Sequence, residues 1–300
     1  MDFRKVQFFL AAVRCGSLTE AAAELGVSQP ALSKAIKALE RSLGVPLIER
    51  GRFGVVATPF GEALRYHGQV VEAEFRHAAG EIESLKGAQK GHVIVGCGPT
   101  EATRLLPLAL NAMQQRRPEV RVTVLYGLNE SLMPWVKHGD IDFALSSVPT
   151  RSQDPDLLHE TLFTESAVVV SRADHPLARM RQIAPALLAQ QQWVLPRQRE
   201  LERQAFDDFF RSHGINPPAA QIETTSTVLM KSMVLQSDAL TFIPRELIYW
   251  EEKARQLRAL PVTGVQWVRP VGMTRRRQGA LSPAGRFVME CVRGVAGQYF

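Results

Sequence analysis

The chain has 300 residues, of which 45% are hydrophobic, so it can form two or three domains with cores of their own. Its 36 Lys and Arg against 30 Asp and Glu give a net charge of +6, which suits a nucleic-acid partner. Residues 1–60 hold eight basic and five acidic side chains, so only +3 of this charge lies in the N-terminal part. Three scattered cysteines argue against a disulfide framework and a zinc site, and no signal peptide or membrane span is evident, so we expect a cytoplasmic protein without metal or cofactor.

The first 25 residues predict two helices. Residues 3–14 form a helix whose inward stripe consists of Val6, Phe9, Leu10 and Val13. Ser17 and Glu20 then form a capping box, so a second helix begins after Ser17 and stops at Gly26. The side chains of this second helix are small, and another helix can therefore cross it closely.

A third helix follows after a turn of only two residues, because Ser28 is an N-cap and Pro30 falls in the first turn. Its apolar positions recur at spacings of three and four and predict a buried stripe of Leu32, Ile36, Leu39 and Leu43. The other sides are polar and basic, and comprise Gln29, Ser33, Lys34, Lys37 and Arg41. This pattern, from Leu18 to Lys37, predicts a helix-turn-helix whose last helix enters the DNA major groove.

The expected DNA contacts follow from the place of each side chain on this helix. Gln29 and Ser33 lie one turn apart near its start, beside Ser28 and Pro30, and are expected to face base edges. The basic residues are expected to contact phosphates, which gives affinity and register. Each feature alone is common in helical domains with solvated surfaces, and only the ordered combination favours DNA binding.

Residues 45–49 and 55–58 predict the two strands of a wing with a basic tip. Arg50 and Arg52 flank Gly51 at this tip and are expected to reach the DNA backbone or a minor groove. The helix-turn-helix and the wing together predict an N-terminal DNA-binding domain over residues 1–58.

Thr58 and Pro59 start a further helix that runs to about Lys86, which is long for a compact domain. Its apolar residues follow a heptad pattern that is interrupted at Gly68 and comprises Leu64, Val71, Phe75, Ala78, Ile82 and Leu85. Packing of the helix on its own domain is one explanation. A homodimer linker over residues 59–90 fits better, because paired helices place two DNA-binding domains on a palindrome.

The block SLTEAAAELGVSQPALSKAIKALERSLGVPLIERG, with the basic wing, the Thr-Pro pair and the long helix after it, resembles the DNA-binding part of LysR-type transcriptional regulators. The resemblance continues through the chain. It implies a regulator rather than an enzyme, with double-stranded DNA and a small-molecule effector as partners. It further implies a homotetramer built as a dimer of dimers, and it allows contact with RNA polymerase.

From His92 onward strands alternate with helices, which predicts a parallel sheet covered by helices. The first segments are HVIVGCG, a helix over 103–116, EVRVTVLYG, a helix over 130–138 and IDFALSS. Separate strands are expected over 162–164 and 167–171, and a return strand over 268–275. The resemblance implies a two-lobed, periplasmic-binding-protein-like (type 2) effector domain over 91–300, with lobe I at 91–163 and 267–300 and lobe II at 164–266.

Ligands of open α/β sheets bind at the carboxyl ends of strands, beside helix N-termini. Side chains at such ends, grouped in one cleft by the resemblance, are Gly98, Pro99, Thr100, Ser146, Ser147, Ser226, Thr227, Ile243 and Pro244. Arg199 is expected to pair with an anionic effector. Ordinary helix capping and surface solvation explain the same residues. The run SDALTFIPRELI resembles regulators of galactose-binding-protein and aromatic-sulfonate operons, which points to an anionic aromatic or a sugar-like effector.

Parts of the sequence are compatible with two alternative functions. Gly96-Cys97-Gly98 follows a strand as in a dinucleotide-binding Rossmann oxidoreductase, but Glu101 occupies the place of the third glycine. A solute-binding protein suits the C-terminal two-thirds but does not explain the N-terminal helices. Cys97 is either a redox-sensitive thiol or a small buried side chain, and the second interpretation is favoured because no partner cysteine is near in sequence.

Overall fold

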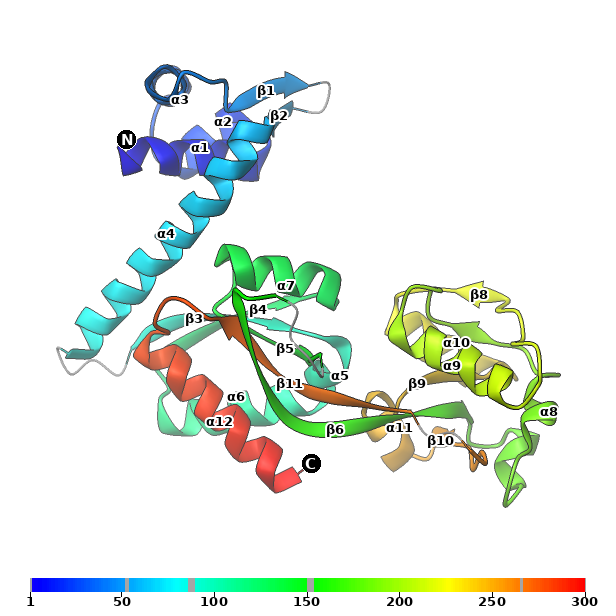
Figure 1. The fold of residues 1–300 in the computed structure, drawn as a ribbon. Helices are drawn as coiled ribbons and strands as arrows, with labels where there is room; N and C mark the ends of the chain where they lie inside the picture. Colours follow the sequence, from blue (N-terminus) through cyan, green and yellow to red (C-terminus); the bar gives the residue numbers. More distant parts are fainter. Residues whose placement is uncertain (1, 52–53, 86–89, 150–153, 265–266, 300) are drawn as a thin grey trace.

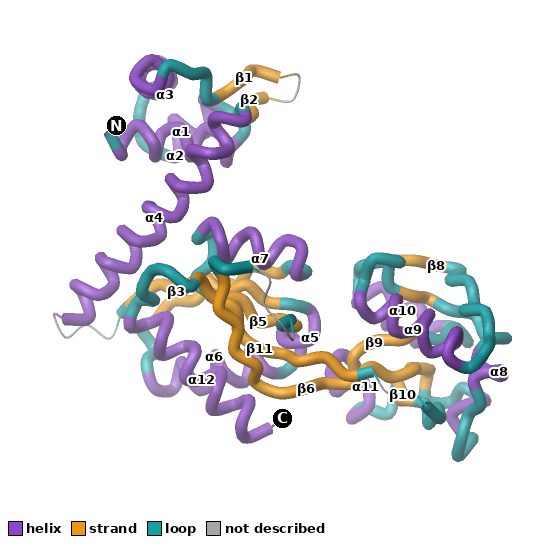
Figure 2. The backbone as a smooth tube through the Cα atoms, in the orientation of Figure 1, coloured by secondary structure: helices purple, strands orange, loops and turns teal. Residues whose placement is uncertain are grey.

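A computed structural model describes residues 2–51, 54–85, 90–149, 154–264 and 267–299. Figure 1 shows three parts in chain order: a small N-terminal domain, one long helix, and an α/β domain in two lobes. The long helix leads from the N-terminal domain to the first lobe, and two extended strands connect that lobe to the second (Figure 2). Among the described residues, no helix has the length and apolar content needed to cross a bilayer.

The N-terminal domain consists of α1 (Phe3–Cys15), α2 (Leu18–Glu24), α3 (Gln29–Leu43) and the hairpin of β1 (Ile48–Gly51) and β2 (Gly54–Ala57). Ser17 and Ser28 cap α2 and α3 through their hydroxyls, as the sequence predicted. Gly26 has a φ of 64°, a left-handed conformation that lets the chain turn sharply between the two helices. The short turn therefore fixes the angle at which α3 crosses α2.

The core of this domain contains the apolar faces of α1 and α3. Leu32, Ile36 and Leu39 are buried, whereas Leu43, expected in the same stripe, is 41% exposed. The expectation for Leu43 was wrong because α3 ends there and the chain turns away at Gly44, beyond the reach of α1. The side chain of Glu40 accepts hydrogen bonds from the amides of Leu47 and Ile48, and so joins α3 to the wing.

Helix α4 (Pro59–Leu85) packs against the N-terminal domain at one end and the first lobe at the other. A Cβ on Gly68 would lie 2.9 Å from Val6 Cγ1 and 3.3 Å from Leu10 Cδ1, so this glycine allows α1 to approach α4. Farther along, His77 Nε2 lies 2.7 Å from the buried carboxylate of Asp142 in lobe I. The helix is thereby attached to both neighbouring parts.

Lobe I is built on the parallel strands β3 (Gly91–Cys97), β4 (Val120–Tyr126) and β5 (Phe143–Ser147), with β3 in the middle. Its helices are α5 (Pro99–Thr103), α6 (Leu105–Arg116), α7 (Asn129–His138) and α12 (Pro283–Tyr299). One apolar core lies between the sheet and α6 with α12, and a second lies under α7. The alternation of strands and helices matches the sequence prediction.

Two long strands, β6 (Leu157–Arg172) and β11 (Val268–Arg276), pair antiparallel and extend from lobe I to lobe II. The expectation of separate strands over 162–164 and 167–171 was wrong, because both lie in the single strand β6. Its polar middle interrupts the apolar pattern where the strand crosses between the lobes, and this interruption looks like a break in the sequence. The continuous strand connects the two lobes.

Lobe II places two apolar cores on the faces of its strands. The strands are β7 (Val194–Leu195), β8 (Ile222–Glu223), β9 (Thr241–Pro244) and β10 (Leu257–Ala259). The helical segments are η1 (Pro176–Arg179), α8 (Pro185–Leu188), α9 (Leu201–Ser212), α10 (Thr227–Gln236), η2 (Arg245–Ile248) and α11 (Tyr249–Lys253). The two lobes also touch directly, because Arg104 Nε lies 3.0 Å from Glu246 Oε2.

Candidate nucleic-acid interface and ligand cleft

The outer side of α3 is the candidate DNA-binding surface. It borders an open hollow lined by Gln29, Pro30, Ser33, Lys34, Lys37, Glu40, Arg41, Gly44, Val45 and Pro46. Lys34, Lys37 and Arg41 are exposed, and within the described part of the chain none of them has an ion-pair partner. Unpaired cations beside an accessible helix face are suited to phosphate binding.

Ser28 is exposed and Gln29 is half-buried at the start of α3. The hydroxyl of Ser28 accepts a hydrogen bond from Ala31 N, so it is occupied in capping the helix. The backbone of Arg50 lies in β1, opposite Val55. The predicted contacts of the Arg50 side chain and of Arg52 lie outside the described residues.

A cavity of about 180 Å³ lies between the two lobes. Nine of the predicted effector residues line it: Gly98, Pro99, Thr100, Ser146, Ser147, Arg199, Thr227, Ile243 and Pro244. They come from the ends of β3, β5 and β9 and from the starts of α5, α9 and α10. Strand ends and helix starts from both lobes thus meet in one place, as expected of an open parallel sheet.

Ser226 is the predicted effector residue that does not line the cavity. Its hydroxyl accepts a hydrogen bond from Leu229 N at 3.2 Å and caps α10. The capping interpretation therefore describes Ser226, whereas the neighbouring Thr225 and Thr227 line the cavity.

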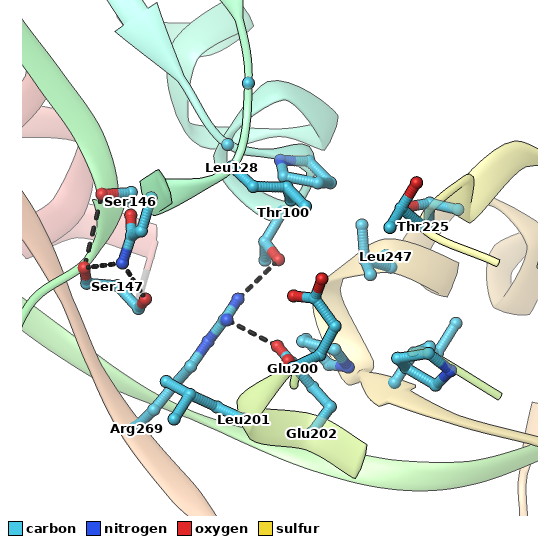
Figure 3. Close-up of a pocket in the computed structure, with 18 of the residues that line it drawn as sticks. Thr100, Leu128, Ser146, Ser147, Glu200, Leu201, Glu202, Thr225, Leu247 and Arg269 are labelled. Atoms are coloured by element: carbon cyan, nitrogen blue, oxygen red, sulfur yellow. Dashed lines mark hydrogen bonds and ion pairs between the residues drawn. The ribbon is translucent and has the colours of Figure 1, made fainter. Parts of the chain in front are cut away.

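Arg269, on the crossing strand β11, lies at the floor of the cavity and bridges the lobes (Figure 3). Its guanidinium contacts Glu202 of lobe II at 2.6 Å and donates a hydrogen bond to Thr100 of lobe I at 2.9 Å. A third contact, of 2.5 Å, joins it to Glu165 on β6. These contacts connect both lobes to both crossing strands.

Glu101, beside this cluster, is only 2% exposed and has one carboxyl oxygen without a hydrogen-bond partner. Burial raises the pKa of Glu101 to about 8, an effect that the nearby charge of Arg269 only partly opposes. The group is therefore mostly neutral at pH 7. Asn129 donates to the carbonyl and hydroxyl of Ser147, and its own side-chain oxygen is buried without a partner.

The sequence reasoning missed the charged lining residues Glu101, Glu130, Glu200, Glu202 and Arg269. The strand-end pattern pointed to small, hydroxyl and apolar side chains and did not include the acidic residues of the helices that follow. A usable signal existed for three of them, because Glu101, Glu130 and Glu202 each lie in the first turn of a helix that follows a predicted strand.

A winged helix-turn-helix, a long connecting helix and a two-lobed α/β domain with a central cavity define a DNA-binding protein with a ligand-sensing domain. The chain matches the family described as bacterial regulatory helix-turn-helix protein, lysR family, over residues 3–62. It also matches the LysR substrate binding domain over residues 86–297. The chain belongs to the LysR family and is a DNA-binding transcriptional regulator with a C-terminal effector-binding domain.

Known relatives span nearly the whole chain. The regulator GalR of Pseudomonas putida is 28% identical over 97% of this chain and 73% of its own length. The regulator CbbR of Xanthobacter flavus is 30% identical over 96% of this chain and 86% of its own. These relatives are transcriptional regulators, which supports this function over a solute-binding protein or an oxidoreductase.

Solved structures show the same fold. A full-length OxyR variant from Pseudomonas aeruginosa has a TM-score of 0.75 at 23% identity, covering 99% of this chain and 94% of its own. Full-length CbnR in complex with its target DNA has a TM-score of 0.69 at 22% identity, covering 98% of this chain and 100% of its own. The predicted fold class, with its N-terminal helix-turn-helix and two-lobed C-terminal domain, is thereby confirmed.

Proposed function

We propose that α3 recognises the operator through Gln29 and Ser33, and that Lys34, Lys37 and Arg41 bind the flanking phosphates. The observation that carries this proposal is the division of α3 into two sides. Leu32, Ile36 and Leu39 are buried against the domain, while the basic side chains remain exposed and unpaired among the described residues. The helix is thus held from behind with its polar side free to enter a groove.

The two groups of side chains should be separable by experiment. We expect Gln29→Ala to weaken binding of the operator by roughly 1–3 kcal/mol and to relax sequence choice, because amide contacts to base edges are lost. Lys37→Ala should weaken binding to all sequences alike and lower the slope of log affinity against log salt by about one. Operators are first identified by sequencing the DNA fragments that the purified protein retains, and affinities are then measured by fluorescence anisotropy.

Arg181→Ala is a suitable control, since it also removes one positive charge but at an exposed position of lobe II, outside the hollow beside α3. It should leave both affinity and salt slope unchanged. Equal loss on operator and random DNA in the Gln29→Ala variant would contradict the assignment of base recognition to Gln29.

In this proposal the chain also forms a homodimer paired through α4, and two such dimers form a homotetramer. The assembled protein controls transcription by RNA polymerase and has no enzymatic activity of its own. The exposed apolar residues of α4 support the pairing: Val71, Phe75, Ile82 and Leu85. Leu64, predicted in the same seam, packs against the core of the N-terminal domain instead. The seam is thus confined to the half of α4 beyond Gly68.

A small-molecule effector occupies the cavity between the lobes and changes their relative position. Thr100 of lobe I and Glu202 of lobe II share the guanidinium of Arg269, so a ligand beside them alters contacts to both lobes at once. Because α4 is attached to lobe I through His77 and Asp142, a shift between lobes is passed toward the DNA-binding domains of the oligomer.

A further inference from the structure

The charges that line the cleft are mainly negative. The carboxylates of Glu130, Glu200 and Glu202 line the cavity, against Arg199 and Arg269, while the buried Glu101 is mostly neutral at pH 7. Arg269 is not free for a ligand, because its guanidinium already contacts two carboxylates and one hydroxyl. Two carboxylates against one guanidinium leave a net negative charge at the floor of the cavity. Arg199 is the remaining cation, and it is exposed at the rim directly before Glu200.

The positive N-terminal ends of helices usually attract anions, but the helix ends at this cleft already interact with carboxylates or capping groups of the protein. Glu130 lies in the first turn of α7 and Glu202 in the first turn of α9, where each carboxylate interacts with the positive end of its own helix. The start of α10 is capped by Ser226. An anionic ligand would therefore meet carboxylates at two of the three longer helices that begin here, and it would be repelled by them.

Two residues that line the cavity each have a buried polar atom without a partner within the described structure. One is Oε1 of Glu101 and the other is Oδ1 of Asn129. The amide of Asn129 is oriented by the carbonyl of Ser147, which can only accept, so the NH₂ group faces Ser147 and Oδ1 is left as an acceptor. An unsatisfied buried acceptor costs about 1–3 kcal/mol, which a ligand recovers by donating a hydrogen bond to it.

We propose that the cleft ligand is a compact molecule that donates hydrogen bonds through hydroxyl or amino groups and carries no carboxylate, sulfonate or phosphate group. This inference rests on the proposed function of the cleft as the effector site. Of the two effector classes expected from the sequence, the proposal favours a sugar-like molecule over an anionic aromatic one. It also allows an amine. Hydroxyl and amino groups satisfy Asn129 and Glu101 and are compatible with the surrounding carboxylates.

The charge preference can be measured without knowing the ligand. Thr225 is exposed and lines the same cavity as Glu200 (Figure 3), so Thr225→Cys introduces a reporter thiol into the full-length protein. Cys97 and Cys291 are buried, and the part-exposed Cys15 is replaced by serine. The rates of modification by trimethylammonioethyl and sulfonatoethyl methanethiosulfonate are then compared, with the neutral methyl reagent correcting for thiol reactivity and mercaptoethanol serving as the free-thiol reference.

The measured quantity is the rate with the cationic reagent divided by the rate with the anionic reagent. We expect this ratio to be about tenfold higher for the cysteine of Thr225→Cys than for mercaptoethanol. Adding Glu130→Gln and Glu200→Gln should bring this ratio back toward the free-thiol value. A ratio at or below the free-thiol value, or one that the two glutamines leave unchanged, would overturn the proposal.

The same modified protein separates this proposal from the function on which it rests. Operator affinity is measured before and after the cationic reagent is attached. An operator affinity that does not change on modification would contradict the proposal that the cleft controls DNA binding. The ratio of the cationic to the anionic modification rate decides the charge preference independently of that result. The Cys15→Ser protein without the reporter gives the background for both measurements.

Discussion

At the scale of single residues, Glu101 contributes a pH dependence of its own. Burial holds its pKa at about 8, above the value of about 4.3 for glutamate in an unfolded chain. The folded state therefore binds more protons than the unfolded state between these two values, and stability falls as pH rises through that range. Below about pH 4 the contribution is fully present.

Glu101→Gln should remove this dependence, because glutamine has nearly the same shape and never ionises. We expect the variant to match the wild type near pH 4.5 and to be more stable by roughly 3 kcal/mol at pH 7. Urea unfolding midpoints across this pH range provide the measurement. Glu81→Gln, at an exposed position of α4 outside the cavity, is the control and should lack the gain at pH 7; a Glu101→Gln variant that also lacks it would show that Glu101 is ionised in the fold.

The sequence could predict those cavity residues that are marked by their neighbours in the chain, but not those marked only by contacts distant in sequence. Thr100, Ser147 and Thr227 follow or precede recognisable elements, so local pattern was sufficient to predict them. Arg269 contacts Thr100 across 169 residues of sequence, and nothing local to either one indicates the pairing. Glu101 was missed because glutamate is usually exposed, and only the packing of the fold shows that it is buried.

At the scale of elements, Gly68 has one effect on the heptad pattern of α4 and another on the packing of α4 against α1. In the heptad pattern it is a weak point, because glycine lowers helix stability and removes an apolar contact. In the structure it is the position at which α1 crosses α4, with Val6 and Leu10 against its Cα. Packing of this helix on its own domain was one explanation of the sequence, but the heptad pattern alone does not show that α1 is the neighbour at Gly68.

Gly68→Ala should accordingly destabilise the protein although alanine is the better helix former. The added Cβ would lie 2.9 Å from a methyl of Val6, whose branched side chain cannot easily move. Overpacking of this kind costs about 1–3 kcal/mol and outweighs the gain of about 1 kcal/mol in helix propensity. We expect a lower urea midpoint for the N-terminal domain.

Gly80 on the same helix is the matched control. A Cβ there would meet only Ser282 at an ordinary 3.4 Å, so Gly80→Ala should be neutral or stabilising. If both alanine variants raised the midpoint, α1 would not be packed on α4 as closely as the structure shows.

At the scale of the whole molecule, the two sides of α4 have different roles. The side that carries His77 is attached to lobe I, where Asp142 accepts hydrogen bonds from His77 and from the amide of Ile94. The opposite side exposes Phe75 by 60%, Ile82 by 54% and Leu85 by 84%. One helix thus fixes the sensing domain on one side and offers an apolar surface on the other.

Pairing of two copies through that surface is the simplest way to remove it from water, and Phe75→Asp with Ile82→Asp should prevent it. The two aspartates replace buried contacts with repelling charges at facing positions. The ring of Phe75 also lies 5.0 Å from that of Phe3 in α1, so affinity for a single half-site, which should persist, checks that the DNA-binding domain remains folded. Affinity for two half-sites should fall by about 100-fold or more, because the second contact is no longer intramolecular.

Sedimentation velocity and anisotropy with one-site and two-site DNA measure these quantities on the same preparation. Glu81→Gln, which changes a charge on the exposed part of α4 without touching the apolar residues, should behave as the wild type. The decisive quantity is the ratio of two-site to one-site affinity. A double aspartate variant that keeps this ratio would place the contact that spaces the DNA-binding domains somewhere other than α4.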